Sequence, residues 1–346
     1  MLHREGASLS GTAGATTMNR RAIFAAPVLL ASPTIFPARA QEVFPSRPIT
    51  IMGGFPNGAG TAIYTRRMAE PLQRLLGQPI VVDNRSGAGG NIASDFVAKS
   101  RPDGYTLLIG TAGTHAINQS LYRTLPFDVL RDFTPIVHLG DVPNVLTTSI
   151  ERRPALQACA DVLAAARVRP QAVSYASTGN GASTHLAGAQ FAAAAGLDLL
   201  HVPYRGQPGA QAAILAGDVD IFFNQIGPAL GSIQQGQTRA LAVTTAARLT
   251  VLPDVPTIAE ACNLPGFVST TWYGLFGPAG LPAAVVERIN AAVQAVVTAP
   301  DFADWLVRSQ GIASPPVRTP TEFAAIQRRD VASWAEIVRR SGATVD

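Results

Sequence analysis

The chain has 346 residues, of which 47% are hydrophobic and 14% charged, as expected for a globular protein long enough for two domains. Its formal charge of +4 comes mostly from the first forty residues, which hold four arginines and one acid, so the rest is nearly neutral. A nearly neutral chain with one lysine, Lys99, excludes a basic nucleic-acid-binding surface and a lysine-containing phosphate loop.

Residues 1–40 predict an export signal. "MNRR" at 18–21 is positively charged, residues 22–36 are mostly apolar, and "ARA" ends at Ala40 with the small residues that a signal peptidase reads. Met18 is a candidate for the true start, and the paired arginines also suit a twin-arginine signal. We expect a periplasmic protein, cleaved near Ala40 and soluble, because no later segment has the apolar length of a membrane helix.

From Pro48 onward, apolar strands, glycine-containing loops and helices alternate. "ITIMGGF", "PNGAG" and "TAIYTRRMAEPLQRLLG" form the first such unit, and "SYAS", "TGNG" and "ASTHLAGAQFAAAAG" form a later one. This alternation predicts an α/β fold with mainly parallel sheets covered by helices.

The units fall into two clusters, before and after Asp141. Segments 141–149 and 265–278 are predicted to be strands that connect the clusters, and helices near 282–298, 301–310 and 320–341 end the chain. The pattern predicts two lobes with loops at the carboxyl ends of their strands facing a cleft.

Cys159 and Cys262 are the only cysteines. Their spacing is neither that of a metal site nor that of a redox Cys-x-x-Cys motif, and an exported chain permits a disulfide. The sequence leaves open whether they pair.

The residues exclude several chemistries. Gly181-Ala182-Ser183-Thr184-His185 lacks the last glycine of a hydrolase nucleophile elbow, and "GAGGN" at 87–91 lacks the third glycine of a dinucleotide fingerprint. The five histidines show no metal spacing. We expect no metal, no cofactor and no catalytic residue.

An anion can still bind at helix N-termini, where free N–H groups and the helix dipole are favourable. The loop after "SYAS" offers backbone N–H groups and hydroxyls at the entrance to a helix. Ordinary helix capping is the alternative for one such loop. Three such loops at one cleft favour a binding site for a carboxylate.

Several motifs resemble the tripartite tricarboxylate transporter substrate-binding family, also called the Bug family of periplasmic solute receptors. They are "FPNGAGT" (55–61), "VVDNRSGAGGNIASDFVAKSRPDGYTLLIGTAGTHAINQSLY" (81–122), "YASTGNGASTHLAG" (175–188), "HVPYRG" (201–206), "ALAVTT" (240–245) and "LPDVPTIAE" (252–260). The resemblance runs from about Pro45 to the carboxyl end.

The resemblance implies a two-lobed periplasmic binding protein of the type II kind, with its ligand cleft between the lobes. Residues 41–141 and 270–346 would form lobe 1 and residues 142–269 lobe 2, with hinge strands near 141–149 and 265–278. Such a receptor captures a small organic acid, a di- or tricarboxylic or aromatic acid, and delivers it to membrane transporter subunits. We expect a monomer.

The resemblance also implies ligand contacts at matching motif positions. The loop after the first strand would hold one carboxylate, and Arg205 would be the candidate cation for a second one, unless it forms a surface salt bridge instead. The predicted ligand-binding residues are Phe55, Asn57, Gly58, Ala59, Thr61, Thr111, Thr114, His115, Ser177, Thr178, Gly179, Asn180, Gly181, Ser183, His185, Tyr204, Arg205 and Asn224.

Two departures from the family pattern concern charge. Ala62 stands where members commonly have Asp, and Phe223-Asn224-Gln225 where many have Phe-Asp-Asn. Both remove a negative charge that could pair with an ammonium, so we expect an acid without an amine. The alternatives are a periplasmic sensor subunit that reports a carboxylate to a sensor kinase, and an exported hydrolase that uses Ser183 or Ser177.

Overall fold

The computed structural model describes residues 44–313, 316–341 and 344–345. The predicted export signal lies outside these residues. None of the helices described is long and apolar enough to cross a membrane.

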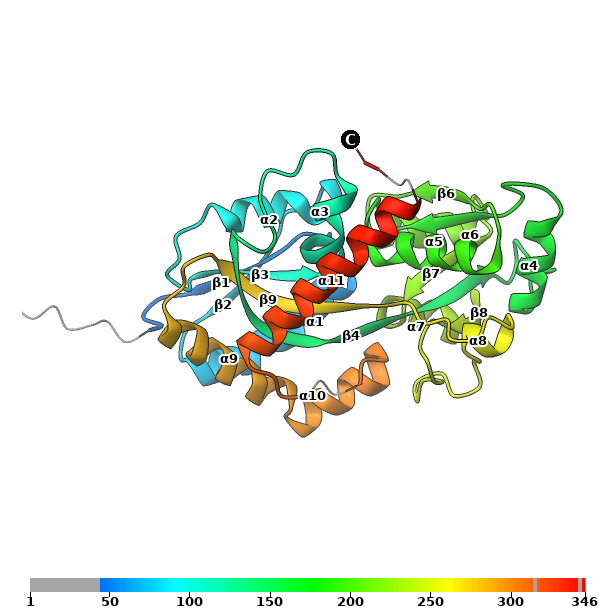
Figure 1. Ribbon diagram of the computed structural model, residues 1–346. Coiled ribbons are helices and arrows are strands. Elements are labelled where there is room, and N and C mark those ends of the chain that lie inside the picture. The colour runs from blue at the N-terminus through cyan, green and yellow to red at the C-terminus, as the bar shows by residue number, and fades with distance from the viewer. Residues whose placement is uncertain (1–43, 314–315, 342–343, 346) are drawn as a thin grey trace, which may run out of the picture. The chain divides into compact units, whose positions relative to one another are not determined.

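The first half of the sheet contains five strands (Figure 1). The parallel strands β2 (Ile80–Asn84), β1 (Ile49–Gly53) and β3 (Thr106–Thr111) lie in that order. β9 (Thr270–Pro278) runs antiparallel to β3, and the first part of β4 (Phe133–Ser149) runs antiparallel to β9. The carboxyl ends of β1 and β3 therefore meet at one edge.

β4 continues into the second half of the sheet, so this strand is shared. From Asn144 onward it pairs antiparallel with β7 (Ile221–Gln225) and β8 (Thr238–Val243). β5 (Ser174–Ser177) is parallel to β7, and β6 (Leu200–Pro203) is parallel to β5. β4 exchanges β9 for β7 and β8 at the Pro143–Asn144 bond.

Helices cover both faces of the first half. Leucine, isoleucine and valine side chains of α1 and α9 form one core with β1 and β4, and α2, the 113–117 turn and α11 form a second core on the other face. The segments are α1 (Gly60–Leu76), α2 (Asn91–Ala98), α3 (Asn118–Leu121), α9 (Ala283–Val297), α10 (Pro300–Trp305) and α11 (Pro320–Ser341), with short helical turns at Ala88–Gly90, Gly113–Ile117 and Leu306–Gln310.

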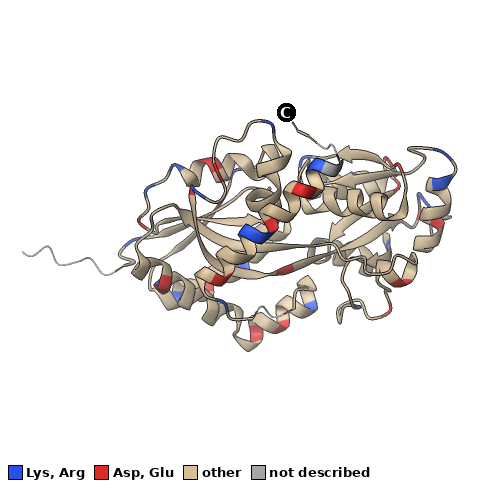
Figure 2. Cartoon of the chain, in the orientation of Figure 1, with Lys and Arg blue, Asp and Glu red and all other residues tan. Residues whose placement is uncertain are grey.

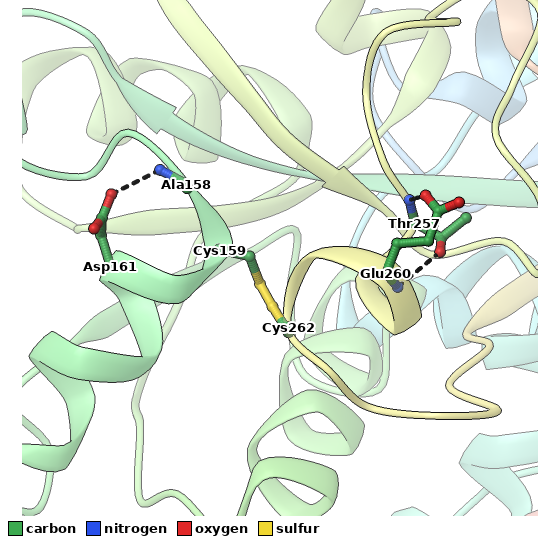
Figure 3. Close-up of a disulfide and its surroundings, with 6 residues drawn as sticks. All are labelled: Ala158, Cys159, Asp161, Thr257, Glu260 and Cys262. Carbon is green, nitrogen blue, oxygen red and sulfur yellow. Dashed lines mark hydrogen bonds between the residues drawn. A yellow bond between two sulfur atoms is a disulfide. The ribbon is translucent and has the colours of Figure 1, made fainter.

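Five helices surround the second half, and a disulfide ties two of them. α4 (Cys159–Arg167), α5 (Ser183–Ala195) and α8 (Ile258–Ala261) share one core, which includes both cysteines. α6 (Gln207–Ala216) and α7 (Ile226–Gln234) pack on separate small cores. Figure 3 shows the Cys159–Cys262 disulfide, with Cα atoms 5.5 Å apart, beside the capping box that begins α8.

The α/β class and the two-lobed arrangement predicted from the sequence are confirmed. The centre of the sheet differs from the mainly parallel pattern, because β9 and β4 are antiparallel to each other and to their neighbours β3, β7 and β8. Buried apolar runs read alike in both directions, so hydrophobicity does not reveal this reversal.

The disulfide should contribute substantially to stability, because it closes a loop across a sequence separation of 103 residues. Removing a disulfide that closes a loop of this size lowers the free energy of unfolding by about 3 to 5 kcal/mol. Replacing both Cys159 and Cys262 with alanine should therefore lower the free energy of unfolding by that amount in urea titrations. Reductant should destabilise the wild type to a similar degree and leave the variant unchanged; an equal response of both proteins would contradict the prediction.

Candidate functional site

A small cavity lies where strands from both halves of the sheet end. Its volume is about 20 Å³, space for about one water molecule. Its walls come from the loops that follow β1, β3, β5, β6 and β7, so both lobes contribute. The lining residues are Phe55, Ala59, Thr61, Thr111, Thr178, Ala182, Ser183, Gln207 and Gln225.

Four helices begin at this cavity, and none has a side-chain cap. The residues before α1, α5, α6 and α7 are Ala59, Ala182, Gly206 and Gln225, and none of them accepts a hydrogen bond from its helix through its side chain. The first turns contain no acidic residue either. First-turn N–H groups have no acceptor one turn earlier in the helix, so those that remain, with four positive helix ends, favour an anion. Pro208 in α6 and Pro228 in α7 lack an N–H, and the His185 N–H in α5 already bonds the Ala182 carbonyl.

Among the residues that the structure describes, no charged side chain lines this cavity. In Figure 2 the lysine, arginine, aspartate and glutamate positions lie mainly on outer helices and loops, and α5, α6 and α7 carry none. The electrostatic field at the cavity therefore comes chiefly from backbone dipoles. This arrangement suits an anion more than a cation.

A larger groove of about 580 Å³ adjoins the cavity, and Phe55 and Thr178 line both. The groove also receives residues from both lobes, including the glycine-rich turn at 86–90 and the segment 204–206. The two lobes approach closely beside it: a Cβ atom on Gly113 would lie 2.8 Å from the carbonyl oxygen of Gly181. Substitution there would push the two loops apart.

The structure brings ten of the predicted ligand-binding residues to these two cavities. Six line the small cavity: Phe55, Ala59, Thr61, Thr111, Thr178 and Ser183. Four more line the outer groove: Gly179, Asn180, Tyr204 and Arg205.

The other eight line neither cavity: Asn57, Gly58, Thr114, His115, Ser177, Gly181, His185 and Asn224. Some of them hold the walls in place. The Thr114 hydroxyl accepts a hydrogen bond from the Thr111 N–H at 2.9 Å, and Asn57 bonds Asn84 and Arg66. Asn224 accepts from Gln207 Nε2 at 2.5 Å and donates to Gln211 Oε1 at 2.9 Å.

The two predicted histidines belong to cores. His115 is fully buried and stacks on Phe276 with ring centroids 4.1 Å apart, and burial lowers its pKa to about 3. His185 stacks on His201 at 4.0 Å and accepts the Gly181 N–H at Nδ1. Burial lowers the pKa of His185 to about 4. Both are neutral at physiological pH.

The two candidate serine nucleophiles have unsuitable partners. The Ser183 hydroxyl faces the Gln225 amide, 3.5 Å from Nε2, and not an imidazole. Ser177 is fully buried and lies 2.7 Å from His201 Nε2, whose pKa is lowered to about 3 by burial and by His185. Such an imidazole is a weak base.

Three lining residues were not predicted: Ala182, Gln207 and Gln225. Gln225 ends β7 and accepts a hydrogen bond from the hydroxyl of Tyr273 on β9 at 2.9 Å. Each of the three residues lies directly before or at the start of a helix, and this position is the one sequence signal that could have identified them. Glutamine chemistry alone does not separate these residues from surface glutamines.

The comparisons with known proteins agree with this geometry. Residues 64–342 match the family described as "Tripartite tricarboxylate transporter family receptor". The chain belongs to this family of receptors.

Curated relatives of this receptor cover nearly the same length. The protein BugT of Bordetella pertussis is 34% identical over 93% of this chain and 96% of the relative. A protein from the tcbD-tcbE intergenic region of Pseudomonas sp. strain P51 is 38% identical over 93% of this chain and 94% of the relative.

Solved structures of similar receptors have the same fold. Rpa4515 of R. palustris, solved with adipate, is 33% identical with a TM-score of 0.82 and covers 87% of this chain and all of its own. MatC of Rhodopseudomonas palustris, solved with bound malate, is 31% identical with a TM-score of 0.79 and covers 85% of this chain and all of its own. The periplasmic binding protein fold is therefore established for this receptor.

The buried His115 should make the receptor less stable in acid. Its pKa is about 3 when folded and near 6.5 when unfolded, so below pH 6.5 the unfolded chain takes up a proton that the folded chain excludes. The stabilisation is complete above pH 6.5 and falls by about 1.4 kcal/mol per pH unit as the pH drops toward 3.

Urea titrations of the wild type and a His115→Asn variant from pH 8.5 to pH 4.5 test this. The variant should lose stability more slowly with acidification than the wild type, whereas their pH dependence should be parallel from pH 7 to 8.5. Equal slopes in acid would show that His115 is not the responsible group.

Proposed function

We propose that this receptor is exported to the periplasm, where it captures a small carboxylate between its lobes and delivers it to a tripartite tricarboxylate-type transporter. The observation that carries the proposal is the convergence of four uncapped helix N-termini on a cavity with no charged lining residue. A carboxylate can accept several of these N–H groups at once. The family membership and the relatives solved with adipate and malate support an organic acid as the ligand.

Ligand capture requires the lobes to move, because a cavity of about 20 Å³ is smaller than any organic acid. We place the lobes at residues 41–141 with 270–346 and at 142–269. The exchange of partners along β4 at Pro143–Asn144 supports this division, since a strand shared by two halves can act as a hinge. Closing then lets both lobes contact one ligand, so binding favours the closed state.

We further propose that the ligand has no amine. An ammonium would lie among positive helix ends without a carboxylate partner, since no acidic residue lines the small cavity. Asn224 adds an amide where many family members have an aspartate at this end of β7.

The backbone N–H of Ser183 provides a direct test, because it is the first helical residue of α5. Ser183→Pro removes both the N–H and the hydroxyl, whereas Ser183→Ala removes only the hydroxyl. Proline fits here, because Ala182 has φ −69° and ψ 155°, in the extended region that a residue before proline adopts, and proline is favoured at the first helical position.

Calorimetry and thermal shift with a panel of di-, tri- and aromatic carboxylates should identify a ligand that raises the melting temperature of the wild type. Ser183→Pro should lower the affinity for that ligand at least tenfold, which is the usual effect of losing a hydrogen bond to a charged group. Ser183→Ala should lower the affinity less than threefold. Equal affinities of the two variants would contradict N–H binding, and a panel without any ligand would contradict the carboxylate receptor.

Arg205 is the proposed partner of a second carboxylate. It is exposed, it lines the outer groove, and the ion pairs formed among the described residues do not include it. An acid held in the cavity by one end could extend past Phe55 and Thr178 into this groove. Its distal carboxylate could then accept two parallel hydrogen bonds from the guanidinium.

Arg205→Gln should therefore weaken the binding of dicarboxylates about tenfold, as measured by calorimetry. The affinity for monocarboxylates should stay within threefold of the wild-type value. Arg205→Lys should restore part of the affinity, since it keeps the charge and loses the bidentate geometry. A uniform loss for both classes of acid would place Arg205 in a structural role instead.

A further inference from the structure

An amide network beside the small cavity holds one lining side chain, that of Gln207. Gln207 Nε2 donates to Asn224 Oδ1 at 2.5 Å, and Asn224 Nδ2 donates to Gln211 Oε1 at 2.9 Å. This bond uses one of the two N–H groups of Nε2, and the carbonyl oxygen of Gln207 takes no part in the network. That oxygen is a hydrogen-bond acceptor and cannot donate.

The Gln207 oxygen has no partner among the described groups. The side chain is 5% exposed, and Oε1 is buried without a donor within hydrogen-bonding distance. The same holds for Oγ1 of Thr61, which is 3% exposed and lines the same cavity from α1. A buried polar atom without a partner is costly, so the Gln207 oxygen requires a hydrogen-bond donor and the Thr61 hydroxyl requires a partner of either kind.

The electrostatics of the site decide the orientation of the network, because turning over all three amides would preserve both hydrogen bonds. Gln207 stands at the start of α6, and α1, α5 and α7 begin at the same cavity. The oxygen end of an amide dipole is favoured near positive helix ends, whereas an amide NH₂ group is disfavoured there.

The missing donor must be neutral. An ammonium is disfavoured by the helix ends and by the absence of an acidic lining residue. An alcohol O–H can donate to Gln207 Oε1 and accept from the Thr61 hydroxyl, which can act as either partner.

We infer that Gln207 determines ligand specificity and selects hydroxycarboxylates, acids that carry an alcohol O–H close to the carboxylate. The inference rests on the proposed carboxylate receptor and specifies its ligand class. An acid without the hydroxyl leaves the Gln207 oxygen unpaired on closure, and sites built around such a group discriminate strongly against the analogue that lacks it.

The test uses pairs of acids that differ by one hydroxyl: succinate and malate, propanoate and lactate, glutarate and 2-hydroxyglutarate. Calorimetry on the wild type should give at least tenfold tighter binding of the hydroxylated member in the pairs that bind. Methionine has a similar length to glutamine and no acceptor oxygen. In the Gln207→Met variant, the affinities for the two members of a pair should therefore differ by less than threefold.

Gln211→Met is the matched control. Gln211 belongs to the same network and does not line the small cavity, so this variant should keep the preference of the wild type. Circular dichroism would check that both variants are folded.

The outcomes separate the inference from the proposed function. Equal binding of both members by the wild type, or a preference that survives in Gln207→Met, overturns the role of Gln207 while the carboxylate receptor stands. Loss of the preference in both variants assigns it to the network as a whole and also overturns the inference. If no acid of the three pairs binds at millimolar concentration and the wider carboxylate panel also fails, the receptor proposal falls and the inference with it.

Discussion

Four helix N-termini without side-chain caps determine how this receptor can work. A missing cap costs about 1 kcal/mol per helix, and Ala59, Ala182 and Gln225 stand where a serine or aspartate would be stabilising; Gly206 costs only a few tenths of that. The chain does use caps elsewhere, as Thr257 and Glu260 show at α8. Placing the uncapped ends together reserves their N–H groups for a ligand at the expense of stability in its absence.

The sheet explains why these ends come from both lobes. α1 follows β1 in the first half, whereas α5, α6 and α7 follow β5, β6 and β7 in the second. β4 belongs to both halves, and the bond between Tyr273 on β9 and Gln225 on β7 links them directly at the cavity. Under the proposed function, lobe movement and ligand contact therefore involve the same residues.

Much of the architecture was predictable because local chemistry determines it. The loop at 175–188 was identified by its small polar residues between a strand and a helix, and the structure places Thr178 and Ser183 at the cavity. The antiparallel centre was not predictable, since the apolar pattern of β4 does not encode its direction.

The positions of individual site residues were also only partly predictable from the sequence. His115 comes directly after a strand-end motif, but the 113–117 turn carries its ring into the core against Phe276. Gln207 reaches the cavity because Asn224 holds its amide. Both outcomes depend on contacts between segments that are distant in sequence.

The disulfide could not be predicted from the sequence either, because only the structure shows that α4 and α8 lie together. It makes residues 159–262 a covalent ring that contains all of α5, α6 and α7. Three of the four helices that begin at the small cavity thus belong to one closed loop of chain, so a single break in that loop would not separate them from the rest of the molecule.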